Sequence, residues 1–210
     1  MNRLPIHQDL YLIAHGQSGK PLIHPSSLAL GLAGATLLEL ALGGLVTVTR
    51  GLAVTSRGPS TGDAVCDDFV SLLTRGRADV RSLIKKGSDG ICERTRESLV
   101  GAGVLVRVSG RRMGMLPYTR YEPADISSIV RASSGARSAV EGWKQPDARC
   151  AALCGLVAVL RLEAELYLDQ PAGRLVGRLL EIAAAGAPPV GELVAVVDAL
   201  VGEAAVAVYR

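Results

Sequence analysis

The middle of the chain carries a dense group of basic side chains. Residues 71–120 contain 11 Lys or Arg and 4 Asp or Glu, whereas residues 1–70 contain 4 and 5, and residues 121–210 contain 8 and 11. The basic residues of this segment are Arg75, Arg77, Arg81, Lys85, Lys86, Arg94, Arg96, Arg107, Arg111, Arg112 and Arg120. Because apolar residues are interspersed among them, we expect a folded basic face rather than a disordered charged tail. Such a face suits the phosphate groups of a lipid or of a nucleic acid.

The end of this segment has the pattern of a β-hairpin. Val104–Val108 and Met113–Leu116 are expected as its strands, with Ser109–Arg112 as the turn and Pro117 closing the second strand. A cationic turn would then adjoin apolar residues on one strand.

That combination suits a membrane surface. We expect Arg111 and Arg112 to contact anionic headgroups, and Met113, Met115 and Leu116 to insert shallowly. Coulomb attraction to an anionic bilayer contributes about 1 kcal/mol for each Lys or Arg near the surface. The alternative is an ordinary hairpin that folds over the core and leaves its arginines, Arg107 included, in water.

No arrangement of residues predicts a catalytic centre or a metal site. The cysteines and histidines are Cys66, Cys92, Cys150, Cys154, His7, His15 and His24. They form neither a CxxC pair nor a Cys/His zinc motif, so we expect the cysteines to be small buried residues and the histidines to lie on the surface or in turns. A nucleophile motif such as GxSxG is also missing. We therefore expect no enzyme activity, cofactor or metal.

Two other motifs have simple structural explanations. His15–Pro21 has two residues between its glycines where a P-loop needs four, and Pro follows the Lys, so we expect a turn. Asp63, Asp67 and Asp68 stand at an expected helix start, where carboxylates interact favourably with the helix dipole.

The remaining chain must supply the scaffold for the basic segment. With 210 residues, 49% hydrophobic and 3% aromatic, it can bury a core of Leu, Val, Ala and Ile, which favours closely packed helices. We predict a mainly α fold, a compact multi-helix domain around a central helical bundle with two short β-hairpins. No linker divides residues 1–210, so one domain is expected.

Helical patterns are distributed over the whole chain. They cover Asp9–Ala14, a segment opened by Pro25 and ended by Gly43, Ala64–Thr74, Asp79–Lys86, Glu93–Gly101, Ala124–Ser133, Ser138–Trp143, Pro146–Leu168, Gly173–Ala184 and Val190–Val208. The other hairpin is expected to have Arg50-Gly51 at its turn.

Leu28–Val48 is apolar enough to suggest a transmembrane segment. Glu39 argues against that reading, because a carboxylate at the bilayer centre costs about 2.5–3.5 kcal/mol on insertion scales. We expect a buried helix followed by a strand, and no transmembrane segment. The N-terminus lacks the apolar stretch of a signal peptide, which favours the cytoplasm.

Several motifs in order resemble one known family. They are Asp9–Ala14, Gly31–Leu40 with Gly43, Ser60–Asp63, Leu99–Leu105, and Trp143 with Pro146, Arg149 and Leu153. In these residues the chain is similar to the Golgi phosphoprotein 3 family, as a bacterial member. The resemblance implies a compact helical domain with β-hairpins, which binds phosphatidylinositol 4-phosphate through a basic pocket and associates peripherally with membranes.

The resemblance also points to individual positions. Where the family has a Trp and an Arg of its lipid pocket, this chain has His24 and Ala33. Where the family has two arginines one turn apart, this chain has Asp89 and Cys92, and Arg94 follows two positions after Cys92. We therefore expect His24 and Arg94, with Arg111 and Arg112, to bind lipid headgroups.

Two other functions fit the same segment. Glu93–Tyr121 is similar to a helix, strand and basic wing of a winged-helix DNA-binding protein, although no helix-turn-helix pair precedes it. Alternatively, the hairpin could bind a protein partner or a second copy of the chain. We expect a cytoplasmic protein that binds anionic phospholipid membranes reversibly, with nucleic acid the less favoured partner and a homo-oligomer compatible with lipid binding.

Overall fold

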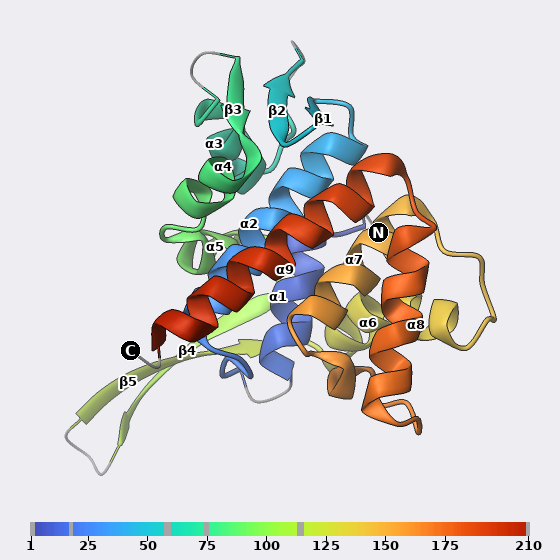
Figure 1. The fold of residues 1–210 in the computed structure, drawn as a ribbon. Helices are drawn as coiled ribbons and strands as arrows, with labels where there is room; N and C mark the ends of the chain where they lie inside the picture. The colour runs from blue at the N-terminus through green and yellow to red at the C-terminus, as the bar shows by residue number, and fades with distance from the viewer. Residues whose placement is uncertain (1–2, 17–18, 57–59, 74–75, 113–115, 209–210) are drawn as a thin grey trace.

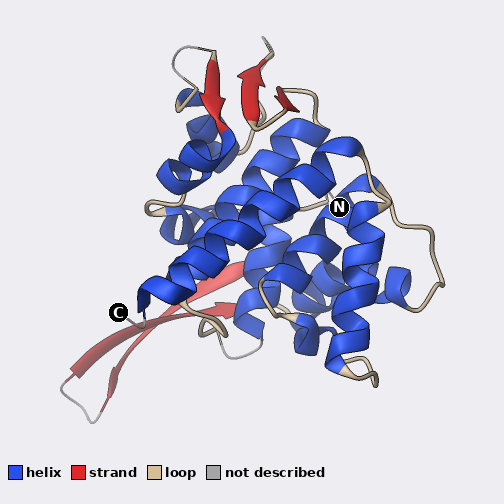
Figure 2. Cartoon of the chain, viewed as in Figure 1, coloured by secondary structure: helices blue, strands red, loops and turns tan. Residues whose placement is uncertain are grey.

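The computed structural model describes residues 3–16, 19–56, 60–73, 76–112 and 116–208, and these are mainly helical (Figures 1 and 2). The helices are α1 (Ile6–His15), α2 (Pro25–Leu42), α3 (Ala64–Ser71), α4 (Val80–Gly87), α5 (Ile91–Gly101), α6 (Ile126–Val140), α7 (Ala148–Val159), α8 (Ala172–Ala184) and α9 (Pro188–Val208), with a 3-10 helix at Glu163–Leu166. The strands are β1 (Val46–Thr49), β2 (Leu52–Thr55), β3 (Arg77–Asp79), β4 (Leu105–Arg112) and β5 (Leu116–Pro123). The predicted mainly α fold with hairpins is confirmed.

Helix α2 is the centre of the core. It contacts α1, α3, α4, α5, α7 and α9, and buried residues occur on all its sides. Gly31 and Gly34 allow the close packing, since a Cβ atom on Gly34 would lie 2.3 Å from Val197 of α9. By length and composition α2 could cross a membrane, yet 56% of it is buried inside the fold. The predicted buried helix followed by a strand is what the structure contains.

Glu39 near the end of α2 has a structural role. Its carboxylate accepts the N–H of Ile6 at 2.8 Å and pairs with Arg149 of α7. Arg149 also donates to the carbonyl of Leu4 at 2.7 Å. This one acidic side chain therefore joins α2 to the start of α1 and to α7.

The first predicted hairpin is confirmed and belongs to a larger sheet. β1 and β2 are antiparallel with Val46 opposite Thr55, and Arg50 and Gly51 form the turn with φ of 52° and 76°. β3 pairs with the other edge of β2, which the sequence analysis did not predict. Its three residues are too few to show an alternating pattern.

The second hairpin has its turn later than predicted. Ser109, Gly110, Arg111 and Arg112 belong to β4, and Arg112 pairs with Leu116. The prediction of a turn at Ser109–Arg112 is therefore wrong. Gly110 lies opposite Tyr118, and its missing Cβ would be 2.8 Å from the Tyr118 hydroxyl, so this glycine makes room for a ring instead of a turn. A two-stranded ribbon has only edge strands, which explains why Pro117 is tolerated inside β5.

Two helix predictions also need correction. Ala124–Ser133 and Ser138–Trp143 were expected as separate helices, but α6 is continuous from Ile126 to Val140 through Gly135. Pro146–Leu168 was expected as one helix, but α7 ends at Val159 and Arg161 has a left-handed φ of 57°. Leu162 and Leu166, which follow Arg161, are buried. The apolar pattern therefore predicts which residues are buried but not where the helix ends.

Candidate functional site

The β4–β5 hairpin extends away from the helical body (Figure 1). At its base Leu105 is buried, and the strands contact α5 and α6. Further along, Val106 is 46% exposed and Tyr118 is 39% exposed, so apolar surface faces solvent where a core would normally cover it. The hairpin is thus anchored at one end and uncovered at the other.

Strand alternation separates the hairpin into two faces. The cross-strand pairs Val106 with Glu122, Val108 with Arg120, and Gly110 with Tyr118 share one face. Arg120 forms an ion pair with Glu122 at 2.7 Å, and its guanidinium lies 5.9 Å from the centre of the Tyr118 ring. This face therefore combines exposed apolar side chains with an arginine.

The other face is fixed at its base by an arginine from α5. The guanidinium of Arg96 lies 4.4 Å from the centre of the Tyr121 ring, a favourable cation–π distance, and 3.9 Å from Glu93. Arg107, opposite Tyr121 in β4, is exposed. Helix α5, which packs on α1 and α2, therefore positions the base of the hairpin.

The loop that leads to His24 touches the same base. Gly19 has a φ of 64°, and a Cβ on it would lie 2.3 Å from the carbonyl oxygen of Tyr121. At the end of α1, the ring of His15 stacks on Tyr11 at 3.9 Å between centroids. Burial lowers the pKa of His15, which disfavours a charge on this ring near the hairpin base.

Two of the predicted headgroup residues, His24 and Arg94, have side-chain partners within the fold. His24 is exposed and caps α2, since its Nδ1 accepts the N–H of Ser26 at 3.3 Å. Arg94 lies 3.7 Å from Asp68 of α3 and donates to the carbonyl of Gly87 at 3.4 Å. Within the described part of the chain, no hydrogen bond or ion pair joins His24 to Arg94.

The predicted hairpin residues are only partly described. Arg111 and Arg112 end β4 and Leu116 begins β5, and for these three the structure gives the backbone course alone. Met113 and Met115 lie outside the described residues. Their expected membrane contact stays a prediction.

The expected basic face is largely neutralised where its side chains are described. Eight cations of residues 71–120 have described side chains, and five of these have an acidic neighbour. Arg81 and Lys85 both pair with Glu203 of α9. These pairs are mostly solvent-exposed, and such pairs typically contribute about 0–1 kcal/mol, so a phosphate group could replace the acidic partner at little cost.

Sequence analysis missed the residues that make the hairpin amphipathic. Val106 and Tyr118 supply its exposed apolar surface, and Tyr121 with Arg96 fixes its base. The alternation of Tyr118, Arg120 and Glu122 on one side of β5 was a usable signal. Pro117 predicts the end of the hairpin from sequence, although β5 continues through it to Pro123.

Together these features define a mainly helical domain that carries a projecting amphipathic hairpin. The model of the Golgi phosphoprotein 3 (GPP34) family matches residues 6–202. The chain therefore belongs to this family, as its motifs indicated. No curated protein matches the chain.

Proposed function

We propose that this chain is a peripheral membrane-binding module that recognises anionic phospholipid headgroups through the β4–β5 hairpin. The observation that carries the proposal is the exposure of Val106, Tyr118 and Arg120 on one face of a hairpin that projects from the helices. Arg107 is exposed on the other face of the same hairpin. Family membership supports the same function.

The hairpin offers two kinds of attraction to a bilayer. Its exposed valine and tyrosine gain free energy when they leave water for the interfacial region. Each arginine near an anionic leaflet adds about 1 kcal/mol, which salt screens. Neither term alone holds a protein on a membrane, so we propose reversible association from the cytoplasm.

By family resemblance, phosphatidylinositol 4-phosphate is the proposed headgroup. The arginine of the family's pocket is replaced by Ala33, which is fully buried in α2, so that position cannot reach a lipid. We propose that exposed His24 and the hairpin arginines bind the phosphate instead. Arg94 would join them by exchanging its contact with Asp68 for a headgroup.

A liposome panel tests this proposal. Purified protein is sedimented with vesicles of phosphatidylcholine alone, and with phosphatidylglycerol, cardiolipin or phosphatidylinositol 4-phosphate added at equal total charge. We expect binding to the anionic vesicles and a steep loss of binding with added salt. Equal binding to neutral and anionic vesicles would refute headgroup recognition, and preference for one anionic lipid at matched charge would identify the headgroup.

Two controls separate the other candidate functions. A gel-shift assay on random DNA duplex, in the same buffer, should show weaker binding than the liposomes do; tighter binding to DNA would favour a nucleic-acid function. Light scattering without lipid measures whether the chain self-associates, and comparing wild type with Met115→Asp tests whether the hairpin tip carries that contact.

A further inference from the structure

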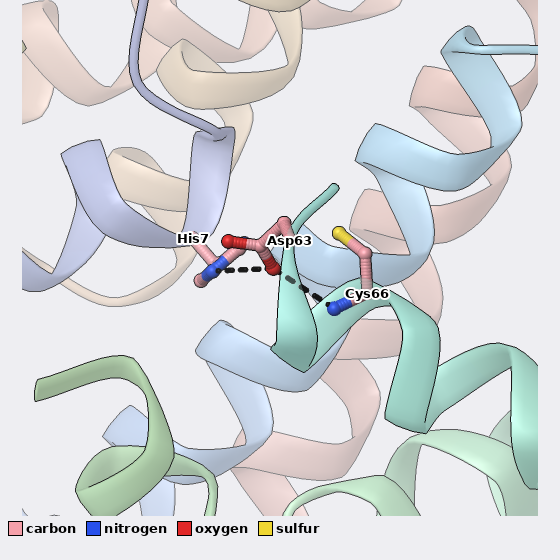
Figure 3. A group of neighbouring side chains, drawn as sticks. All are labelled: His7, Asp63 and Cys66. Carbon is pink, nitrogen blue, oxygen red and sulfur yellow. Dashed lines mark hydrogen bonds and ion pairs between the residues drawn. The ribbon is translucent and has the colours of Figure 1, made fainter. Parts of the chain in front are cut away.

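Three side chains with metal-binding chemistry meet at the junction of α1 and α3. They are His7 in the first turn of α1, Asp63 immediately before α3, and Cys66 in the first turn of α3 (Figure 3). A ring nitrogen, a carboxylate oxygen and the sulfur all lie within 4.8 Å of one another. His7 is fully buried, which corrects the expectation that the histidines lie on the surface or in turns.

The start of α3 explains why Asp63 and Cys66 are neighbours. Asp63 is the N-cap residue, and its carboxylate accepts the N–H of Cys66 at 2.9 Å. Residues at the N-cap and three positions later have side chains on the same side of the first turn, as in a capping box. Helix α1, packed on α2 and α5, then brings His7 to the carboxylate.

His7 is the part of this cluster that capping does not explain. Its side chain has no exposed surface, and neither ring nitrogen has a hydrogen-bond partner within the described part of the chain. Its Nε2 is 3.6 Å from Asp63 Oδ1, which is too long for a hydrogen bond. An unsatisfied buried nitrogen costs about 1–3 kcal/mol, and a metal bound on the Asp63 side would remove that cost for Nε2.

We propose that His7, Asp63 and Cys66 bind a divalent transition-metal ion of the zinc class. Nitrogen, oxygen and sulfur ligands are those that zinc prefers, at about 2.0–2.3 Å. Ligand atoms around a tetrahedral zinc are about 3.4–3.6 Å apart, and His7 Nε2 already lies 3.6 Å from Asp63 Oδ1. The Cys66 sulfur lies within 4.8 Å of these ligand atoms, so a rotation of its side chain would complete the set.

The charges of the site balance. Asp63 and the Cys66 thiolate together offset a divalent cation, so the buried complex is neutral. On binding, the sulfur–hydrogen bond of Cys66 breaks, a sulfur–metal bond forms, and the proton leaves to solvent. Burial lowers the pKa of His7, which favours the neutral form of the ring that binds metals. Burial, together with the nearby carboxylates of Asp63, Glu39 and Asp67, raises the pKa of the Cys66 thiol. The metal must therefore displace the thiol proton.

The direct test is metal titration of the wild-type chain. Protein without an affinity tag is stripped with a chelator and titrated with Zn²⁺ by calorimetry, and with Co²⁺ as a spectroscopic probe. We expect one ion per chain, release of about one proton measured in buffers of different ionisation enthalpy, and a cobalt–thiolate charge-transfer band. Absence of stoichiometric binding, or binding of cobalt without the thiolate band, would overturn the site.

Variants assign the ligands. Cys66→Ser and His7→Gln should each weaken Zn²⁺ binding at least tenfold, and Cys66→Ser should abolish the thiolate band. Cys92→Ser and His24→Gln change a cysteine and a histidine outside the cluster and should bind as wild type does. Asp63→Asn keeps a good N-cap residue, so it tests the carboxylate if His7→Gln fails to fold. Unchanged affinity in folded Cys66→Ser would refute the assignment.

Discussion

The two hairpins expose similar side chains but are held in different ways. β1–β2 exposes Leu52 (47%) and Val54 (44%) near Arg50, and β4–β5 exposes Val106 and Tyr118 near Arg107. The first hairpin is covered along one edge by β3, and its turn is fixed to α9, because Glu192 accepts the N–H of Gly51 at 2.7 Å. The second is held at its base and projects.

Exposed apolar residues alone therefore do not identify a binding surface. Each hairpin exposes two apolar residues, but their charge differs, since β4–β5 contains Arg107, Arg111, Arg112 and Arg120 whereas β1–β2 contains Arg50. Anchoring separates them as well, because β4–β5 extends from the helical body (Figure 1) whereas the turn of β1–β2 is bonded to α9. We expect the way each hairpin is held to determine how it responds to substitution.

The largest effect is expected where the first hairpin enters the core. Ala53 in β2 is fully buried, so Ala53→Gln adds volume and a polar group to a packed site. The expected loss in free energy of unfolding is about 3 kcal/mol. Val106→Gln, the matched change on the half-exposed second hairpin, should cost less than about 0.5 kcal/mol. Urea unfolding of both variants measures this, and equal losses would show that β4–β5 is buried against the body.

The anchor on α9 should give the next effect. Glu192→Ala removes the acceptor of the Gly51 N–H and should lower the free energy of unfolding by about 1.5–2 kcal/mol. Glu192→Gln keeps an acceptor oxygen and should recover most of the loss. If both variants match wild type in urea, the turn of the first hairpin is not held by α9.

The join between β3 and α4 adds a pH-dependent contribution. Asp79 caps α4, and the hydrogen bonds from Ser82 lower its pKa. Asp79→Ala should cost about 1 kcal/mol at pH 7. Because the folded pKa is depressed, this stabilisation is present above the ordinary Asp value of about 3.9 and is lost as the pH falls below it. Urea unfolding should therefore show the difference from wild type shrinking in acid; a difference that is constant with pH would contradict the cap.

The smallest effect concerns the first turn itself. Arg50 has a positive φ of 52°, a conformation that Asn adopts more readily, and Gly follows it as the turn requires. Arg50→Asn should raise the free energy of unfolding by about 0.5 kcal/mol. Thermal unfolding would show a higher midpoint, and a lower midpoint would mean that the Arg50 side chain makes a stabilising contact.

The core was predictable because its signal is local. The apolar residues of α2 occur all round the helix, and Pro25 and Gly43 mark its ends, so its place in the core followed from the sequence. The same holds for the turn at Arg50-Gly51. Where the signal was local but ambiguous, as at Gly110, the prediction of a turn failed, because the Tyr118 ring that explains this glycine comes from the opposite strand.

The sites depend on contacts that no local pattern reports. Arg94 was expected in a lipid pocket, yet it reaches Asp68 of α3, and Arg81 reaches Glu203 near the other end of the chain. His7 is predicted to lie on the surface or in a turn, yet it is fully buried next to Asp63, and this contact with the start of α3 has no local sequence signal. The net charge of each segment can be counted from the sequence. The acidic partners that neutralise individual basic side chains are set by tertiary packing and cannot be.

The most direct test compares lipid binding by the two hairpins in matched variants. One protein carries Val106→Gln, Arg107→Gln and Tyr118→Gln, and the other carries Arg50→Gln, Leu52→Gln and Val54→Gln. Each is sedimented with anionic vesicles after its fold has been checked by circular dichroism. We predict that the first loses at least tenfold in vesicle binding while the second binds as wild type does. Equal binding by both, or loss in the second alone, would contradict the proposal that β4–β5 is the membrane-contacting element.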